Sequence, residues 1–217
     1  MNICFISDTH GKHRDCVIPK GVDMLIHTGD ISNIGKINEI EDFLSWFSNL
    51  EATYKIFIAG NHDFLFDKKH ERCLYKDLDI ESIIPSNVIY LYNETIEIEG
   101  IKIFGSPYSP FFYNWAFNKY GIEIAPIWDN IQEGTDIILT HTPPKGILDY
   151  TFSGDNAGCP YLRDKLLEIK PKINAFGHIH EAYGITEIDG VKYINSSFLY
   201  TYSEKDYNKP IVINYKK

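Results

Sequence analysis

Five short runs of apolar residues recur along the chain, and each ends in a polar segment. The runs are nearly continuous in apolar character, which is typical of strands buried on both faces of a sheet. They span Asn2–Ser7, Asp23–His27, Lys55–Ala59, Asp136–Thr140 and Lys172–Phe176. The pattern therefore predicts a sheet that is covered by helices.

Two further pairs of runs predict β-hairpins. Thr95–Glu99 and Lys102–Phe104 lie on either side of Glu99-Gly100. Tyr183–Glu187 and Lys192–Asn195 lie on either side of Asp189-Gly190, a strong turn dipeptide.

Helical spacing of apolar residues appears in three segments. Ser32–Leu50 carries apolar side chains near every third or fourth position, and Pro160–Ile169 begins with proline and is closed by Pro171. A third helix is expected around Lys69–Leu78, whereas the aromatic stretch Ser106–Tyr120 fits no single element. Strands and helices alternate early and hairpins come late, so we expect an α/β sandwich of sheets flanked by helices.

Composition narrows the class of protein. The 217 residues contain no linker or repeat, and we treat residues 1–217 as a single domain. The formal net charge of −9 disfavours a sequence-independent nucleic-acid footprint, although bound cations can invert a local field. Four cysteines without a C-x-x-C pair suggest free thiols in a reducing compartment. With neither a signal-like segment nor a membrane span in the sequence, we expect a cytoplasmic protein.

The most informative residues follow the five buried strands. Open α/β sheets bind ligands beyond the carboxyl ends of their strands. Here these ends provide Asp8 and His10, Asp30, Asn61 with His62 and Asp63, His141, and finally His178 and His180. Carboxylate, imidazole and carboxamide groups together suit divalent metals of borderline softness. Glycines precede Asp30, Asn61 and His178, and would permit a close approach of the backbone.

Taken singly, each of these motifs has an ordinary structural explanation. Asp and Asn often cap helices or form turns, and a lone histidine is more often a satisfied polar residue than a ligand. Their occurrence in this order, each after a strand, favours a metal site over five unrelated turns.

The same order resembles the calcineurin-like metallophosphoesterase superfamily over essentially the whole chain, Asn2 to about Asn214. The segments FISDTHGKH, LIHTGDIS, IAGNHD, FGSPYSPFFYNWAFN, EGTDIILTHTPP and FGHIHEAYG look like the metallophosphoesterase domain-containing proteins, which are relatives of the class III cyclic-nucleotide phosphodiesterases.

The resemblance implies a four-layer sandwich of two mixed β-sheets flanked by helices. It also implies two divalent metal ions. Asp8, His10 and His180 would hold the first metal, Asn61, His141 and His178 the second, and Asp30 would bridge both. Manganese is the first expectation for the metal, with iron and zinc as alternatives.

The implied reaction is hydrolysis of a phosphoester by a hydroxide held between the two metals. His62 would act as the general acid, and Asp63 would orient its ring. We found no convincing Ser-His-Asp arrangement or P-loop.

The sequence leaves three hypotheses for the substrate and the activity. A phosphodiesterase for small or cyclic nucleotides could stack a base on the aromatic stretch 106–120, although most of these rings could equally pack as core. An extra Arg or Lys aimed at the site would favour a phosphomonoesterase or protein phosphatase; Lys12 and Arg14 lie near the first motif but could equally be ordinary exposed residues. The complete ligand set disfavours a non-catalytic scaffold of the same fold. The acidic net charge disfavours long nucleic acid as a substrate.

Overall fold

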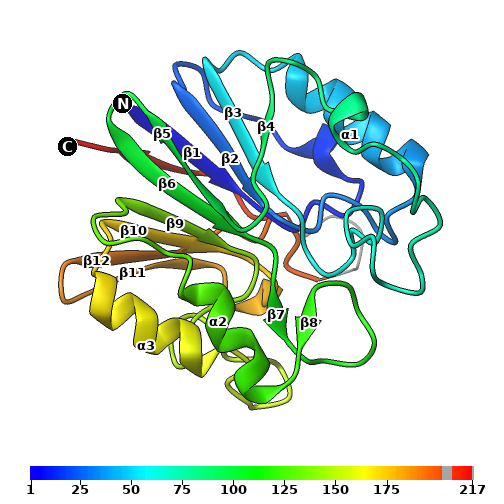
Figure 1. Cartoon of the computed structure of the whole chain (residues 1–217). Helices are drawn as coiled ribbons and strands as arrows, with labels where there is room; N and C mark the ends of the chain where they lie inside the picture. The colour runs from blue at the N-terminus through cyan, green and yellow to red at the C-terminus, as the bar shows by residue number, and fades with distance from the viewer. Residues whose placement is uncertain (202–206, 217) are drawn as a thin grey trace.

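Two β-sheets packed face to face form the centre of the protein (Figure 1). The computed structural model describes residues 1–201 and 207–216. The first sheet has the order β13-β1-β2-β3-β4. Its strands are β1 (Asn2–Ile6), β2 (Met24–Thr28), β3 (Tyr54–Ile58), β4 (Ile89–Tyr90) and β13 (Ile211–Asn214). β13 is antiparallel to β1 and the other pairs are parallel, so this sheet is mixed.

The second sheet has the order β11-β12-β10-β9-β6-β5. Its strands are β5 (Glu94–Ile98), β6 (Ile101–Ser106), β9 (Ile137–Thr140), β10 (Ile173–Phe176), β11 (Gly184–Ile188) and β12 (Val191–Asn195). The four central strands run parallel, and a hairpin strand at each edge runs antiparallel. A separate small pair joins β7 (Ser109–Pro110) to β8 (Asn118–Lys119).

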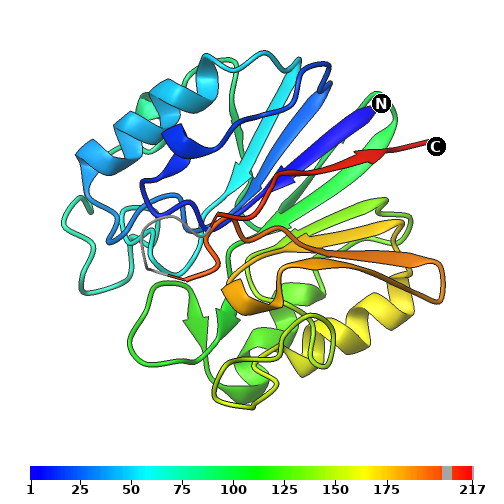
Figure 2. The same ribbon diagram turned by 180° about the vertical axis from the view of Figure 1, so that it is seen from behind.

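Helices cover the outer face of each sheet, which gives the predicted four layers. α1 (Ile37–Ser48) lies outside the first sheet, while α2 (Ala125–Trp128) and α3 (Pro160–Ile169) lie outside the second (Figures 1 and 2). Single 3₁₀ turns occur at η1 (His13–Asp15), η2 (Glu81–Ile83), η3 (Gly121–Ile124) and η4 (His180–Ala182). Among the residues described, none of the helices combines the length and apolar character that a membrane crossing requires.

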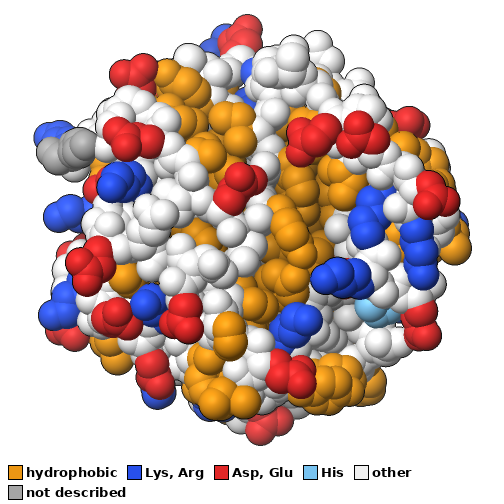
Figure 3. Space-filling view, viewed as in Figure 1, with side chains coloured by type: hydrophobic (Ala, Val, Ile, Leu, Met, Phe, Trp, Pro, Cys, Tyr) orange, Lys and Arg blue, Asp and Glu red, His pale blue; other side chains and the backbone are white. Residues whose placement is uncertain are grey.

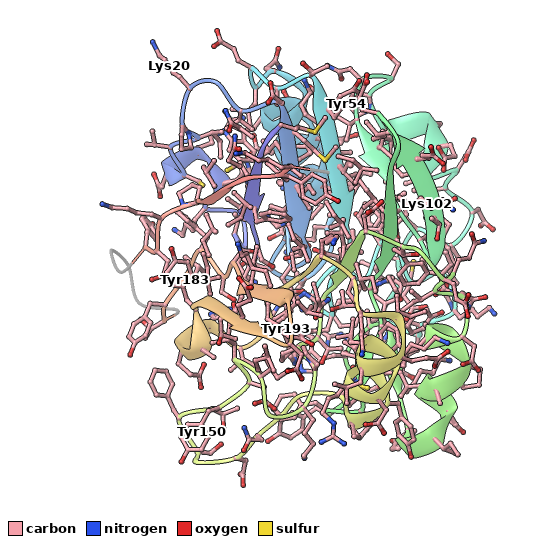
Figure 4. All side chains as sticks on the ribbon, turned by 90° about the vertical axis from the view of Figure 1, so that its left-hand side faces the viewer. Lys20, Tyr54, Lys102, Tyr150, Tyr183 and Tyr193 are labelled. Atoms are coloured by element: carbon pink, nitrogen blue, oxygen red, sulfur yellow. The ribbon has the colours of Figure 1, made fainter. Side chains whose placement is uncertain are left out.

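The apolar side chains form three clusters that match the layers. Phe5 and Leu139 belong to the cluster between the two sheets. Phe43 packs α1 on the first sheet, and its ring stacks on Phe47 at 5.1 Å between centroids. Tyr193 of β12 is buried against α3 (Figure 4). These nearly continuous apolar runs are buried on both sides because each sheet has a neighbour on each face.

Both hairpins and α3 confirm the sequence predictions. At the first hairpin turn, Glu99 and Gly100 have φ angles of +50° and +76°. At the second, Asp189 and Gly190 have φ angles of +51° and +81°. Two consecutive positive φ angles define the tight turn that matches the twist of paired strands.

Two helix predictions differ from the structure. α1 begins at Ile37 rather than Ser32, because Gly35 has φ +67° and Lys36 is extended. The segment Lys69–Leu78 is not helical but forms a series of turns, so that prediction was wrong. The unassigned stretch 106–120 contributes the end of β6 and the two short strands β7 and β8.

The carboxyl ends of the two sheets meet at one edge. Ser7, just after β1, forms a parallel β-bridge with Ser197, just after β12. The Phe198 amide donates to the Ser7 carbonyl at 2.8 Å. Polar residues that follow strands of different sheets are therefore brought to a common place. The four cysteines are free and buried, as predicted.

Candidate metal centre

The loop after β1 is locked to the loop after β2. The Asp8 amide donates to the Gly29 carbonyl at 2.9 Å, and the His10 amide donates to the Asp30 carbonyl at 3.0 Å. Asp8, His10 and Asp30 have φ angles of +51°, +42° and +56°. Such left-handed conformations are unfavourable for these residues and persist where the surroundings enforce them, often at functional sites.

Asp8, His10 and His180 form a first buried cluster. Nε2 of His180 lies 3.5 Å from Oδ1 of Asp8 and 3.3 Å from Nε2 of His10. The three ligand atoms lie within 4.8 Å of one another. Asp8 is further fixed because its carboxylate accepts from the His178 amide at 3.0 Å and the Ser197 hydroxyl at 2.8 Å.

Asp30, His141 and His178 form a second cluster with the same spacing limit of 4.8 Å. Nε2 of His141 lies 3.3 Å from Oδ2 of Asp30 and 2.9 Å from Oδ1 of Asn61. The other ring nitrogen of His141 contacts the Thr28 carbonyl at 3.0 Å. That contact requires a proton on Nδ1, which leaves Nε2 of the neutral ring as the atom for a metal.

Asp30 belongs to the second cluster and also lies close to His10 of the first. Its Oδ2 atom is 3.3 Å from His141 Nε2 and 3.6 Å from His10 Nε2. A third group of potential ligand atoms joins His10, Asp30 and His62. The structure thus brings together all seven side chains that the sequence nominated as metal ligands, namely Asp8, His10, Asp30, Asn61, His141, His178 and His180.

Two glycines make this convergence possible. A Cβ atom on Gly60 would lie 2.3 Å from Oδ1 of Asp30, and one on Gly177 would lie 2.0 Å from Oδ2 of Asp8. Both distances are far below van der Waals contact, so no other residue fits at either position without displacing a carboxylate. The sequence expectation of close backbone approach is confirmed at both glycines.

Burial and charge set the protonation of the ring nitrogens. Burial lowers the pKa of His10 to about 4 and that of His178 to about 3. Burial also disfavours the charged form of His141, but the carboxylates of Asp30 and Asp8 outweigh it and raise that pKa to about 9. Despite burial, the neighbouring imidazoles hold the pKa of Asp30 well below its ordinary value. Metals bind ionised carboxylates and neutral imidazoles, so a cation held by His141 would have to displace a proton from that ring.

The donor set fits divalent cations. Its buried carboxylates, imidazoles and one carboxamide are the mixture that manganese, iron and zinc accept. Buried anions are costly unless a positive charge compensates them. Among the residues that the structure describes, neither lysine nor arginine forms an ion pair with Asp8 or Asp30. The residues present therefore fit a metal centre.

His62 stands beside the clusters with a fixed ring. Its Nδ1 contacts the Asn33 carbonyl at 2.6 Å, and Nε2 lies 4.0 Å from Oδ2 of Asp30. The ring stacks on Trp115 with 4.2 Å between centroids. Because Nδ1 must donate to a carbonyl, Nε2 is the nitrogen that can exchange a proton with a substrate.

Asp63 does not orient His62 in the way the sequence suggested. In the described part of the chain, its carboxylate makes no hydrogen bond to the imidazole, and Asn33 occupies that position. Instead it accepts hydrogen bonds from the amides of Ile31, Ser32 and Gly60 and from the Ser32 hydroxyl. Burial and the nearby charge of Asp30 raise the Asp63 pKa to about 6. Asp63 therefore ties together the loops that carry Asp30 and Asn61.

Sequence reasoning missed Ser197 and Asn33, and it considered Trp115 as a surface for a base but not as a partner of His62. Ser197 closely follows the predicted strand Lys192–Asn195, so the rule that nominated the other strand ends could have found it. Trp115 lay in the unassigned aromatic stretch, and Asn33 acts through its backbone carbonyl, which no residue type signals. Arg14, considered as a phosphate-binding cation, pairs instead with Asp42 of α1 at 2.5 Å.

A cavity of about 660 Å³ opens beside the clusters. Asp30, Asn61, His62 and His178 line its inner part. Pro110, Phe111, Phe112 and Trp115 form an apolar wall, and Thr151, Ser153, Ala157, Ile179 and Glu181 complete the lining. This arrangement is typical of small-molecule sites, in which a few convergent polar groups are set in an apolar surround.

Comparison with known proteins agrees with this site. The family model described as calcineurin-like phosphoesterase matches residues 1–182, and the chain belongs to that family. It is 35% identical to Metallophosphoesterase domain-containing protein 1 from Homo sapiens, over 96% of this chain and 69% of the human protein. A UPF0046 protein from Caenorhabditis elegans is 35% identical over 88% of this chain and 54% of that protein.

Solved structures share the fold. Phosphopantetheinyl hydrolase from Mycobacterium tuberculosis has a TM-score of 0.62 with 15% identity, covering 90% of this chain and 88% of that chain. TT1561 of Thermus thermophilus has a TM-score of 0.57 with 13% identity, covering 89% and 88%. Family membership and the clusters together identify a metal-dependent phosphoesterase that hydrolyses phosphoric esters.

Proposed function

We propose that this protein is a binuclear phosphodiesterase for small substrates, cyclic or other small nucleotides among them. One observation carries the proposal: Oδ2 of Asp30 lies 3.3 Å from Nε2 of His141, in its own group of ligand atoms, and 3.6 Å from Nε2 of His10, in the other group. A carboxylate placed in this way suits two cations that share a bridge.

The donors divide between the two metals as follows. Asp8, His10 and His180 would hold one cation, Asn61, His141 and His178 would hold the other, and Asp30 would be shared by both. We expect manganese first, with iron or zinc as alternatives, because mixed nitrogen and oxygen donors admit all three. When bound, such a pair of cations neutralises charge on the phosphoryl oxygens and activates a water as the nucleophile.

The chain's own contribution to bond cleavage is a proton at His62. Its ring is held between Trp115 and the Asn33 carbonyl, with Nε2 directed toward Asp30. From there Nε2 delivers a proton to the departing alkoxide. Asp63 acts indirectly, because its carboxylate fixes the backbone from which His62 projects.

The shape of the cavity supports a substrate with a second ester arm. Phe111, Phe112 and Trp115 line one side, where a planar group such as a base gains about 1–3 kcal/mol by stacking. The cavity of about 660 Å³ suits a small molecule better than a polymer.

A metal-restoration assay tests this function. The protein is treated with chelator, manganese is restored stepwise, and hydrolysis of bis-p-nitrophenyl phosphate is compared with that of p-nitrophenyl phosphate. We expect diester turnover that is lost with chelator and recovered with about two manganese ions per chain. Equal turnover in chelator would overturn the metal mechanism, and saturation at one ion would overturn the binuclear assignment.

A further inference from the structure

Glu181 is an acidic side chain that the proposed mechanism leaves without a role. It follows His180 in η4 and lines the cavity together with Asp30, His62 and His178. Its Oε1 accepts a hydrogen bond from the Phe152 amide at 2.5 Å. The carboxylate is therefore held at the cavity by a loop that approaches from another part of the chain.

Glu181 differs from the other acids near the site. Asp8 and Asp30 belong to the groups that could hold a metal ion, so bound cations would neutralise their charge. Glu181 belongs to none of these groups among the described residues, and its negative charge would persist in the loaded enzyme. Within the described lining of the cavity, no lysine or arginine compensates it.

The charge on a phosphoester depends on its class. Near neutral pH, a phosphodiester carries one negative charge, whereas a phosphomonoester is largely a dianion. A fixed carboxylate at the cavity therefore repels a monoester about twice as strongly as a diester. The wall formed by Phe111, Phe112 and Trp115 is uncharged, so it accepts a neutral second arm without such a penalty.

We propose that Glu181 is a specificity-determining residue, whose carboxylate selects monoanionic phosphodiesters over dianionic phosphomonoesters. This inference rests on the proposed function and deepens it. Glu181 acts by repelling surplus charge at the cavity, without ligating a metal or transferring a proton. The same side chain holds the Phe152 loop through the hydrogen bond to its amide.

Glu181→Gln separates these two effects, because glutamine removes the charge but keeps an oxygen that accepts from the Phe152 amide. The substrates are p-nitrophenyl phosphate and its methyl ester, which share a leaving group and differ by one charge. We expect the ratio of kcat/KM for monoester to that for diester to rise about five- to tenfold in the variant. Glu181→Lys should raise this ratio further, and salt should reduce the gain of each variant because exposed charges are screened.

Glu187→Gln is the matched control. Glu187 lies on β11 of the neighbouring hairpin, is exposed, and pairs with Lys192 at 3.9 Å. It carries the same charge change but does not line the cavity, so the ratio should stay at the wild-type value.

The outcomes separate this inference from the function beneath it. Wild-type protein without metal-dependent hydrolysis of either ester would overturn the proposed function. Metal-dependent hydrolysis with unchanged ester ratios in both folded Glu181 variants would overturn the charge selection alone. A shift in ratio that salt leaves untouched would also contradict it, because that result would indicate a role in shaping the loop.

Discussion

Nε2 of His141 lies 2.9 Å from Oδ1 of Asn61, although 80 residues separate them in the chain. Asn61 follows β3 of the first sheet and His141 follows β9 of the second. Both atoms can donate a lone pair to a metal, so their proximity places one proposed metal position at the edge where the carboxyl ends of the two sheets meet.

Removal of Asn61 should disable this position. We expect Asn61→Ala to lower kcat/KM for a diester by at least about 10–100-fold, because a direct ligand should matter no less than the outer-shell partners whose loss has that effect. Titration calorimetry with manganese should show one of the two binding sites lost while the other remains. Asn49→Ala, at the exposed end of α1, is the control and should bind metal normally. Unchanged stoichiometry in Asn61→Ala would contradict the ligand assignment.

Substitution of His62 should affect substrates according to their leaving groups. A p-nitrophenolate leaves without help, whereas a simple alkoxide needs a proton. In His62→Gln, we therefore expect alkyl diesters to lose about 10²–10⁴-fold in kcat and nitrophenyl diesters much less. Rates are followed by phosphate-ester release over a series of leaving groups. Equal losses across the series would exclude the general-acid role.

Loss of the Ser197 hydroxyl should weaken metal binding without removing a ligand. This hydroxyl donates to Oδ2 of Asp8 at 2.8 Å. In Ser197→Ala we expect about 10–100-fold weaker affinity for the cation held by Asp8. The affinity is measured by competition with a metal indicator, and Ser48→Ala on the exposed end of α1 serves as the control. Equal affinities in the two variants would show that Asp8 is positioned without Ser197.

Asp63 should contribute mainly to stability. Its carboxylate accepts from three amides and one hydroxyl in a buried setting, and Asp63→Ala leaves these donors without an acceptor. We expect the free energy of unfolding of the metal-free protein to fall by about 3–5 kcal/mol in urea titrations. Asp164→Ala, which removes an exposed ion pair with Arg163, should cost at most about 1 kcal/mol. Similar costs for the two variants would refute this role.

Two buried thiols should make the fold sensitive to alkali. Burial raises the pKa of Cys4 and Cys16 to about 12, from an ordinary value of 9.0. The unfolded chain releases these protons near pH 9 while the folded chain retains them, so their stabilising contribution is intact below pH 9 and lost between pH 9 and about pH 12. In Cys16→Ala the slope of unfolding free energy against pH should be shallower by up to about 1.4 kcal/mol per pH unit. An identical slope would show that Cys16 does not titrate in this range.

The apolar runs were sufficient to predict the central strands, because strands buried on both faces leave little freedom in their sequence. The start of α1 could not be predicted from spacing alone. The Ser32 hydroxyl donates a hydrogen bond to Asp63, and Gly35 has a left-handed backbone. The residues that were expected to form the first turn of α1 therefore form a loop at the site. β13 was missed because its four residues become a strand only by pairing with β1, more than 200 positions away.

The candidate ligands were predictable for a related reason. They follow strands, and strand ends of parallel sheets meet at one edge. The orientation of His62 could not be predicted, because a backbone carbonyl and an aromatic ring from two loops determine it. Backbone amides hold the Asp63 carboxylate in place, and the residue types in a sequence do not show which amides donate to it.

The bridge from Ser7 to Ser197 has a consequence for assembly of the holoprotein. The proposed donors to each cation come from segments that are adjacent only after both sheets have docked, so a partly folded chain would not offer a complete set of ligands. We therefore expect the metal ions to bind late in folding, so that they slow unfolding and leave the rate of refolding nearly unchanged.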